Sequence, residues 1–166
     1  LLIMGLAAPI ALMELLALKF GYIREIDLTN MLTQPRKMKH RKWHKGTSKG
    51  NDTRGTEVSY GSFGLKALGT KWITANQMES ARKAITKAMK RKGKLWIRIF
   101  PQKPITQKGG EVGMGGGKGA VDHYVFPIKP GRVIFEIDGV DEKIAVIAFR
   151  KAADKLPIKV KFVKKD

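Results

Sequence analysis

The chain of 166 residues contains no cysteine. This absence excludes disulfide bonds, thiol catalysis and the zinc sites that are built on cysteine ligands. It fits a reducing compartment, where disulfides rarely persist. Acidic residues are scarce as well, because 14 Asp and Glu stand against 33 Lys and Arg, which gives a formal net charge of +19 at pH 7. Such an excess destabilises a compact monomer through self-repulsion, so we expect an anionic partner, with nucleic acid favoured over an acidic membrane.

The sequence also lacks an uninterrupted apolar run long enough to span a membrane. Residues 1–20 are mostly apolar, but Glu14 and Lys19 interrupt them, and a spanning helix needs roughly 18 continuous apolar residues. No basic stretch precedes this segment, and it lacks the Arg and Ser of a transit peptide, so it is a poor targeting signal. We therefore interpret residues 1–30 as an extension from an upstream start or from cloning. An amphipathic membrane anchor is the alternative.

Nucleotide-hydrolysis motifs are missing from the sequence. The glycine-rich run at 113–119 fails the phosphate-loop pattern, because Val112 stands where that pattern requires glycine. The residue after Lys118 is Gly119 instead of the required Ser or Thr. The run also fails the dinucleotide-binding pattern, because strand-like sequence follows it where a helix would be needed.

Metal-binding and acid–base motifs are equally weak. His40 and His44 lie four residues apart, but the neighbouring Lys and Arg would repel a cation, and no carboxylate completes a site. Four acids form a cluster in the sequence: Glu136, Asp138, Asp141 and Glu142. Asp141 and Glu142 suit the start of a helix, where negative charge is favourable, better than they suit acid–base catalysis. We therefore expect a protein that is not an enzyme and that has no metal ion and no cofactor.

Positive charge is densest between residues 36 and 49, which hold seven Lys or Arg, two His and no acidic residue. Such a run cannot fold on itself, because like charges repel and little apolar surface is available to offset the loss of chain entropy. We expect residues 31–54 to form a basic arm that becomes ordered on a polyanion, with its aromatic rings stacking on unpaired bases. The expected binding residues of the arm are Arg36, Lys37, Lys39, His40, Arg41, Lys42, Trp43, His44, Lys45 and Lys49.

The strongest helix signal follows Thr74. This residue stands three positions before Gln77, the spacing of a capping box, and Gly93 stands where a helix often ends. One face of the predicted helix is apolar at helical spacing: Met78, Ala81, Ile85, Ala88 and Met89. The other face is strongly cationic, with Glu79 as its only acid, so we expect it to contact phosphates. The candidate contacts are Arg82, Lys83, Lys87, Lys90 and Arg91, with Lys92 beside them.

The rest of the sequence predicts strands, a long loop and a second helix. Apolar, β-branched and aromatic runs predict strands within 56–72 and at 95–100, 121–128, 132–137 and 158–162, with a turn at 129–131. Residues 103–120 predict a loop with seven glycines. Residues 141–156 predict a helix that ends before Pro157, with a core face of Ile144, Ile147, Ala148, Ala152 and the stem of Lys155. This mixed order indicates an α+β fold with two helices packed on a mixed or antiparallel sheet.

Several longer motifs occur in the order found in one ribosomal family. They are M-L-T-Q-P-R-K and R-K-W-H-K-G (31–46), G-S-F-G-L-K-A (61–67), L-W-I-R-I-F-P-Q-K-P-I-T (95–106), M-G-G-G-K-G (114–119), I-K-P-G-R-V-I-F-E-I-D-G-V (128–140) and A-A-D-K-L-P-I-K (152–159). Across 31–166 the chain therefore resembles the bacterial ribosomal protein L16 family of the large subunit. Residues 1–30 have no recognised counterpart in that family.

The resemblance implies a hammerhead-type fold and a single domain at 31–166 that binds large-subunit rRNA in a bacterial, cytoplasmic ribosome. It implies a position near the central protuberance and the aminoacyl-tRNA site, a role in subunit assembly, contacts with neighbouring ribosomal proteins, and no homo-oligomer. The loop at 103–120 corresponds to the family's loop that is directed toward tRNA. Its expected tRNA-proximal residues are Lys108, Gly113, Met114, Gly115, Gly116, Gly117 and Lys118.

One position departs from the family pattern. Bacterial relatives often carry an arginine, hydroxylated in some, where this chain has Gly113, so that cationic contact at the loop tip is missing here. Two other classes of function stay open from the residues alone. One is a membrane-surface protein that uses residues 1–30 together with the basic arm, and the other is a free-standing RNA chaperone.

Overall fold

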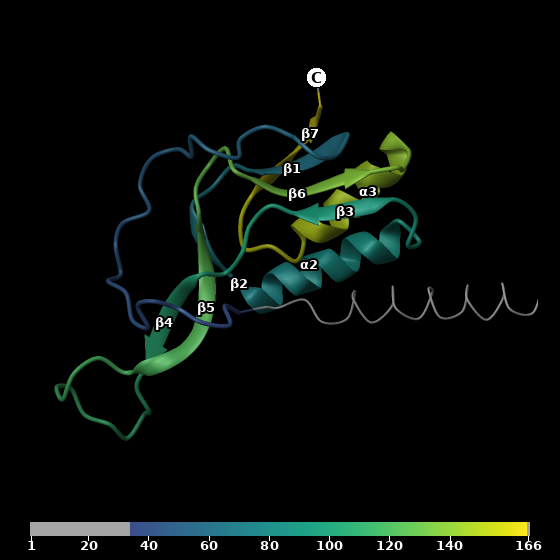
Figure 1. Ribbon diagram of the computed structural model, residues 1–166. Coiled ribbons are helices and arrows are strands. Elements are labelled where there is room, and N and C mark those ends of the chain that lie inside the picture. Colours follow the sequence, from purple (N-terminus) through teal and green to yellow (C-terminus); the bar gives the residue numbers. More distant parts are fainter. Residues whose placement is uncertain (1–33, 166) are drawn as a thin grey trace, which may run out of the picture. The chain divides into compact units, whose positions relative to one another are not determined.

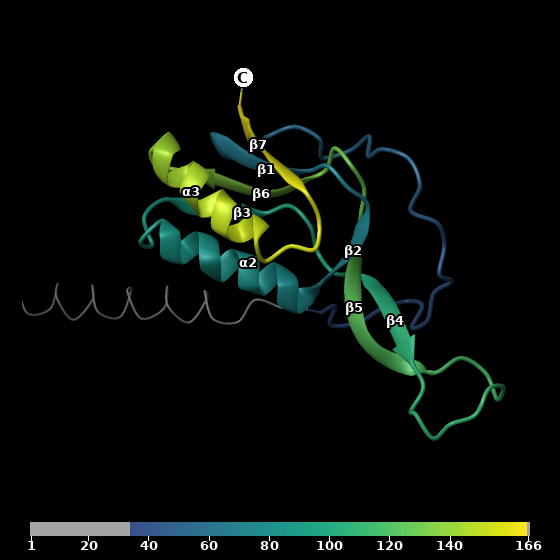
Figure 2. The same cartoon turned by 180° about the vertical axis from the view of Figure 1, so that it is seen from behind.

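The computed structural model describes residues 34–165, so the prediction for residues 1–30 lies outside the described residues. A four-stranded antiparallel sheet forms the main layer, in the order β3-β6-β1-β7 (Figure 1). Its strands are β1 (Phe63–Ala67), β3 (Lys94–Ile97), β6 (Val133–Asp138) and β7 (Val160–Lys164). Helices α2 (Ala75–Ala88) and α3 (Glu142–Ala153) pack together on one face of this sheet (Figure 2). The predicted α+β class with two helices is confirmed.

A second, three-stranded antiparallel sheet stands beside the first, in the order β2-β5-β4. It consists of β2 (Lys71–Thr74), β4 (Lys103–Gln107) and β5 (Ala120–Ile128). The β4–β5 hairpin projects away from the helices and ends in the connection 108–119 (Figure 1). The predicted turn at 129–131 is present, but the strands on either side of it belong to different sheets.

Helix α2 begins as its sequence predicts. The Thr74 hydroxyl accepts a hydrogen bond from the Gln77 amide at 3.3 Å, and the Gln77 side chain accepts one from the Thr74 amide at 3.0 Å. The predicted core residues Met78, Ala81, Ile85 and Met89 are buried. The prediction that Gly93 caps the helix is wrong, because the helix ends at Ala88. Gly93 is needed elsewhere, because a Cβ there would collide with the Asp138 carbonyl oxygen and only glycine permits this approach.

The core face of helix α3 is shifted from the one that its sequence predicts, although the predicted core residues Ala148 and Ala152 are buried. Ile144 and Ile147 are 38% and 53% exposed, and Lys155 is exposed as well, so these three assignments are wrong. The buried face consists of Ala145, Ala148, Phe149 and Ala152. This set has the same helical spacing as the predicted one, and its small alanines let α3 approach α2 closely. Periodicity alone could not distinguish the two faces.

The predicted loop at 103–120 is too long, because Lys103–Gln107 form β4. Pro104 lies within this strand although proline donates no backbone hydrogen bond. The strand tolerates it because β4 is the edge of its sheet, where an amide can stay unpaired. The glycine-rich connection is therefore confined to 108–119. The preceding predicted strand also ends early, at Ile97 instead of Phe100.

Candidate nucleic-acid interface

The basic arm contains neither helix nor strand over its described residues 34–54, and its binding candidates all face solvent. Each of the ten candidates, from Arg36 to Lys49, is exposed. The ring of Trp43 is 39% exposed, and its Nε1 donates a hydrogen bond to the His40 carbonyl at 3.0 Å. The side chains expected to meet phosphates and bases are therefore accessible to a partner.

The C-terminal end of the arm is fixed to the turn between β5 and β6. The Asp52 amide donates to the Pro130 carbonyl at 2.9 Å, and the Arg132 guanidinium donates to the Arg54 carbonyl at 2.7 Å. Arg132 also lies 3.8 Å from the Asp52 carboxylate. These contacts involve backbone and side chains of both segments. They fix the position of the C-terminal end of the arm on the folded part.

The arm and the glycine-rich connection, predicted as separate sites, meet in the structure. The Lys42 ammonium donates to the Lys118 carbonyl at 2.6 Å, and the Lys118 ammonium donates to the Trp43 carbonyl. The two segments are therefore joined by a reciprocal pair of hydrogen bonds. We call the cluster of Lys42, Trp43, Lys45, Lys103 and Lys118 the arm–loop junction.

Lys103 is the buried cation of this junction, and no sequence pattern predicted it. Its side chain is 8% exposed, its ammonium donates to the Lys45 carbonyl, and it lies 4.5 Å from the centroid of the Trp72 ring. Burial lowers the pKa of Lys103, and the positive charges of Lys118 and Lys45 lower this pKa further. Both contacts of this side chain are with residues distant in the sequence, which local residue spacing does not reveal.

The cations of α2 and of the turn that follows it differ in their exposure. Lys83, Lys87, Lys90 and Arg91 are exposed, as predicted. Arg82 instead makes two hydrogen bonds to the Glu79 carboxylate, at 2.7 and 2.8 Å, and its side chain is only 11% exposed. Hydrogen bonding to Arg82 lowers the pKa of Glu79. Arg82 therefore has few donors left for a phosphate.

The connection 108–119 is open to solvent at its tip. Met114 is fully exposed, and no atom lies within 4 Å of a Cβ built on Gly113, Gly115, Gly116 or Gly117. The last three of these glycines have positive φ angles between 63° and 92°. Lys108 folds back onto the connection, with its ammonium donating to the Gly113 and Gly115 carbonyls. The tip thus offers backbone to a partner without steric obstruction.

A buried carboxylate, Glu136, holds the segment before β1 in place. It accepts hydrogen bonds from the amides of Ser59, Tyr60 and Gly61 and from the Arg98 guanidinium, and it is inaccessible to solvent. Burial alone would raise the pKa of Glu136, but these donors together lower it. The sequence shows Glu136 only as one member of an acidic cluster and does not predict this structural role.

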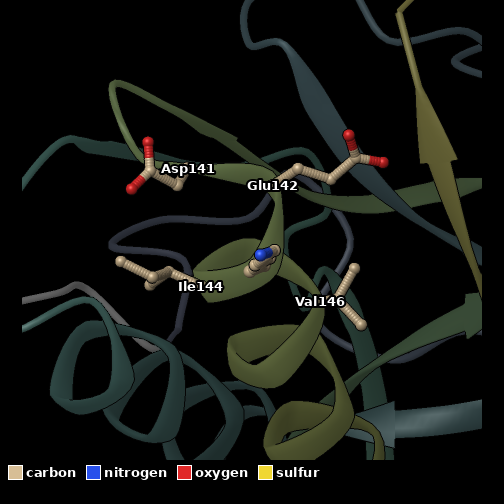
Figure 3. Close-up of a pocket in the computed structure, with 5 residues that line it drawn as sticks. Asp141, Glu142, Ile144 and Val146 are labelled. Carbon is tan, nitrogen blue, oxygen red and sulfur yellow. The ribbon is translucent and has the colours of Figure 1, made fainter.

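The acids at the end of that cluster border a surface hollow at the start of α3, which Lys143, Ile144 and Val146 also line (Figure 3). The carboxylates of Asp141 and Glu142 point away from each other in this view, and Glu142 bonds to the Lys164 ammonium at 2.5 Å. These two carboxylates therefore do not form a pair suited to acid–base catalysis. Among residues 34–165, no group of three or more His, Cys, Asp or Glu could hold a metal ion.

No helix in the described part of the chain is long and apolar enough to cross a membrane.

Exposed cationic segments on a small α+β domain are typical of a nucleic-acid-binding protein, and comparison with known proteins specifies the class further. The family model described as ribosomal protein L16p/L10e matches residues 35–163, so the chain belongs to this family. The chain is 55% identical to large ribosomal subunit protein uL16 of Bacteroides thetaiotaomicron over 132 residues, which cover 80% of this chain and 92% of that protein. It is 53% identical to large ribosomal subunit protein uL16 of Karelsulcia muelleri over 135 residues, covering 81% and 99%.

The resemblance found in the motifs is thereby confirmed, and the family is one of structural, non-enzymatic proteins. The comparisons give no support to the alternative of a membrane-surface protein.

Proposed function

We propose that this protein is a structural constituent of the bacterial large ribosomal subunit that binds rRNA through its basic arm and reaches tRNA with the connection 108–119. The arm–loop junction carries this proposal. Four lysines gather there, and in the described structure three of their ammonium groups bond only to backbone carbonyls. Such a cluster is self-repelling until phosphates neutralise it and release their own counterions.

The arm supplies the main rRNA contact. Its ten candidate residues are exposed, so an RNA surface can contact each of them. Lys and Arg provide affinity through the phosphates, while Trp43, His40 and His44 provide flat rings for unpaired bases. The exposed cations of α2 provide additional phosphate contacts.

The connection 108–119 supplies the tRNA contact. Its root is fastened to the arm through Lys118, so an arm bound to rRNA also fixes where the connection starts. Its tip stays free, and glycine lets the backbone approach a crowded partner closely. The candidate contacts at the tip are Lys108, Gly113, Met114, Gly115, Gly116 and Gly117, with Lys118 at the root.

We further propose that residues 31–166 form one rRNA-binding domain with the hammerhead-type fold implied by the family, and that they suffice for assembly. The match to the family model begins at residue 35 and supports this division. A chain that starts at Met31 should enter large subunits as well as the full chain does. Failure of the shorter chain in a reconstitution assay would show that residues 1–30 contribute. Neighbouring ribosomal proteins are further expected partners, and no homo-oligomer is expected.

Salt dependence of rRNA binding tests the central role of the junction. The variant K42Q/K45Q/K118Q removes three junction charges, and K143Q/K151Q/K155Q removes three exposed charges on and after α3 as a matched control. We expect the junction variant to lower the slope of log affinity against log salt by up to about 0.9 for each phosphate that it no longer binds. Equal salt slopes for both variants would contradict the proposal, because they would show that RNA binding depends on the total positive charge and not on its position at the junction.

A further inference from the structure

A second surface with the chemistry of an RNA contact lies on the four-stranded sheet, on the face that the helices leave open. Phe135 and Ile137 of β6 belong to the core beneath α2 and α3. Because side chains alternate along a strand, Glu136 lies on the opposite face. Trp96 of β3 and Gly64 of β1 pair directly with Glu136 and share this open face.

The segment before β1 lies tightly on this open face. A Cβ on Gly64 would come within 2.6 Å of the Val58 side chain, and one on Gly61 within 2.5 Å of the Ile137 carbonyl oxygen. The hydrogen bonds from the amides of residues 59–61 to Glu136 fix the same segment. The backbone of Tyr60 is therefore held in place, although its side chain is 63% exposed.

The Tyr60 ring belongs to a stacked group. It lies 6.3 Å from the Trp96 ring with an interplanar angle of 23°, and the guanidinium carbon of Arg98 lies 4.8 Å from its centroid. Arg98 is itself held by Glu136. We call Tyr60, Trp96 and Arg98 the Tyr60 platform. A rigid, exposed aromatic ring of this kind is suited to stacking with a nucleobase, since every base has a π-face.

Two lysines lie on the same face of the sheet as the platform. Lys66 of β1 and Lys161 of β7 are directly opposite each other, an arrangement of like charges that destabilises a sheet. Within residues 34–165 neither lysine takes part in an ion pair. The Lys165 ammonium, which donates to the Ser59 carbonyl at 3.3 Å, is a third cation next to Tyr60. An anion over this face would relieve the repulsion.

We propose that the open face of the four-stranded sheet binds a short unpaired stretch of rRNA, with one base stacked on Tyr60 and phosphates bound by Lys66 and Lys161. This inference rests on the ribosomal function proposed above, but it uses none of the arm, loop or α2 residues. The stacking group and the lysine pair favour RNA over an acidic protein, because bases and phosphates together satisfy both features. Glu136 at the centre of the platform is buried and bonded to Arg98, so it does not repel phosphate. Asp138 lies two residues further along β6 on the same face, where it pairs with Lys94 across the strands and accepts a hydrogen bond from the Ser62 hydroxyl.

Binding of an oligouridylate that contains 4-thiouridine tests this site on the full chain. Irradiation of the wild-type complex should cross-link the peptide that contains Tyr60. Replacing Tyr60 by Ala should weaken binding roughly 5-fold to 100-fold, the loss typical of one stacked base, while Tyr60→Phe keeps the ring and the affinity. K66Q/K161Q should lower the salt slope by up to about 0.7 for each single-strand phosphate that it no longer binds. K151Q/K155Q is the control that removes the same amount of charge.

The outcomes separate this site from the arm and the loop. If Tyr60→Ala and K66Q/K161Q bind like the wild type while K42Q/K45Q/K118Q loses affinity, the platform only covers the Glu136–Arg98 pair, and the proposal is overturned. If neither the wild type nor any variant binds RNA, the proposed ribosomal function itself is contradicted. Thermal melting identifies a variant that is unfolded, and the cross-link in the wild type then decides. A wild-type complex without a cross-link at Tyr60 also overturns the proposal.

Discussion

Charges are neutralised differently in the helix-covered sheet and in the arm–loop junction. In the first region, carboxylates meet cations of the same chain: Glu136 with Arg98, Glu79 with Arg82, and Glu142 with Lys164. In the junction, lysine ammonium groups bond only to carbonyl oxygens in the described structure. These carboxylates of the first region are neutralised within the free protein, whereas the lysines of the junction are neutralised only by an external anion. Stability and partner binding should therefore respond to different mutations.

The largest effect should come from the core face of α3. Phe149 is 2% exposed, so Phe149→Ala removes a buried ring and should cost about 3–5 kcal/mol of unfolding free energy. Ile147 is 53% exposed, so Ile147→Ala should change this free energy by roughly 0.5 kcal/mol or less. Urea unfolding of both variants measures the difference. Similar destabilisation of both would mean that the helix packs in the orientation that the sequence pattern first indicated.

The next effect should come from Glu136. Replacing it by Gln leaves Arg98 without its anionic partner and should cost up to about 3 kcal/mol near neutral pH. Since the pKa of Glu136 is lower in the folded than in the unfolded state, its contribution is present above the unfolded pKa and is lost as pH falls through the folded one. Lowering the pH below 4.5, the reference pKa of Glu136, should therefore destabilise the wild type more than it destabilises the Glu136→Gln variant.

Glu142→Gln is the matched control for this pH experiment, because its ion pair with Lys164 is exposed on both sides. Exposed pairs contribute about 0–1 kcal/mol, so the control should unfold with nearly wild-type stability. A Glu136→Gln variant that follows the wild-type pH curve would contradict the structural role of this buried carboxylate.

Shortening the glycine-rich connection should affect the fold little. Deletion of Gly113–Gly117 removes exposed residues with no core contacts, and a shorter connection changes closure entropy by only about 0.6 kcal/mol. Binding of aminoacyl-tRNA by subunits reconstituted with this variant should nevertheless weaken. Circular dichroism melting and tRNA binding, measured together, check both statements. A sharply lower melting temperature would assign the connection a structural role, and normal tRNA binding by a folded variant would leave it without a functional one.

The smallest effect on stability should come from the exposed face of α2. K83Q/K87Q/K90Q removes positive charges that repel one another, so its melting temperature should equal or slightly exceed that of the wild type. Its salt slope for rRNA should fall by up to about 0.9 for each phosphate that the helix no longer binds. An unchanged slope would show that this face lies in solvent within the subunit.

Local signals in the sequence predicted the local structure well. The capping box at Thr74, the buried face of α2 and the exposed candidates of the arm could be derived from residue type and spacing. Burial that depends on distant packing could not. Two faces of α3 had equal helical spacing, and only the approach of α2 selects the one with Ala145 and Phe149.

The same limit applies to the candidate sites. Lys103 is a lysine like many others until the arm covers it, and Glu136 is one of several acids until the segment before β1 folds over it. The meeting of Lys42 with Lys118 joins residues 76 positions apart. Spacing along the chain contains no information about such contacts, so the junction and the Tyr60 platform could be found only in the structure.

Hydrogen–deuterium exchange of the protein, free and within reconstituted large subunits, tests the central distinction most directly. We predict fast exchange in the free protein at 36–49 and 108–119, because the described structure has no regular hydrogen bonding there, and strong protection of both segments in the subunit. The core amides of α2 and α3 should be protected in both states. An arm and connection that are already protected in the free protein, or that stay unprotected in the subunit, would contradict the claim that the arm–loop junction is completed by RNA.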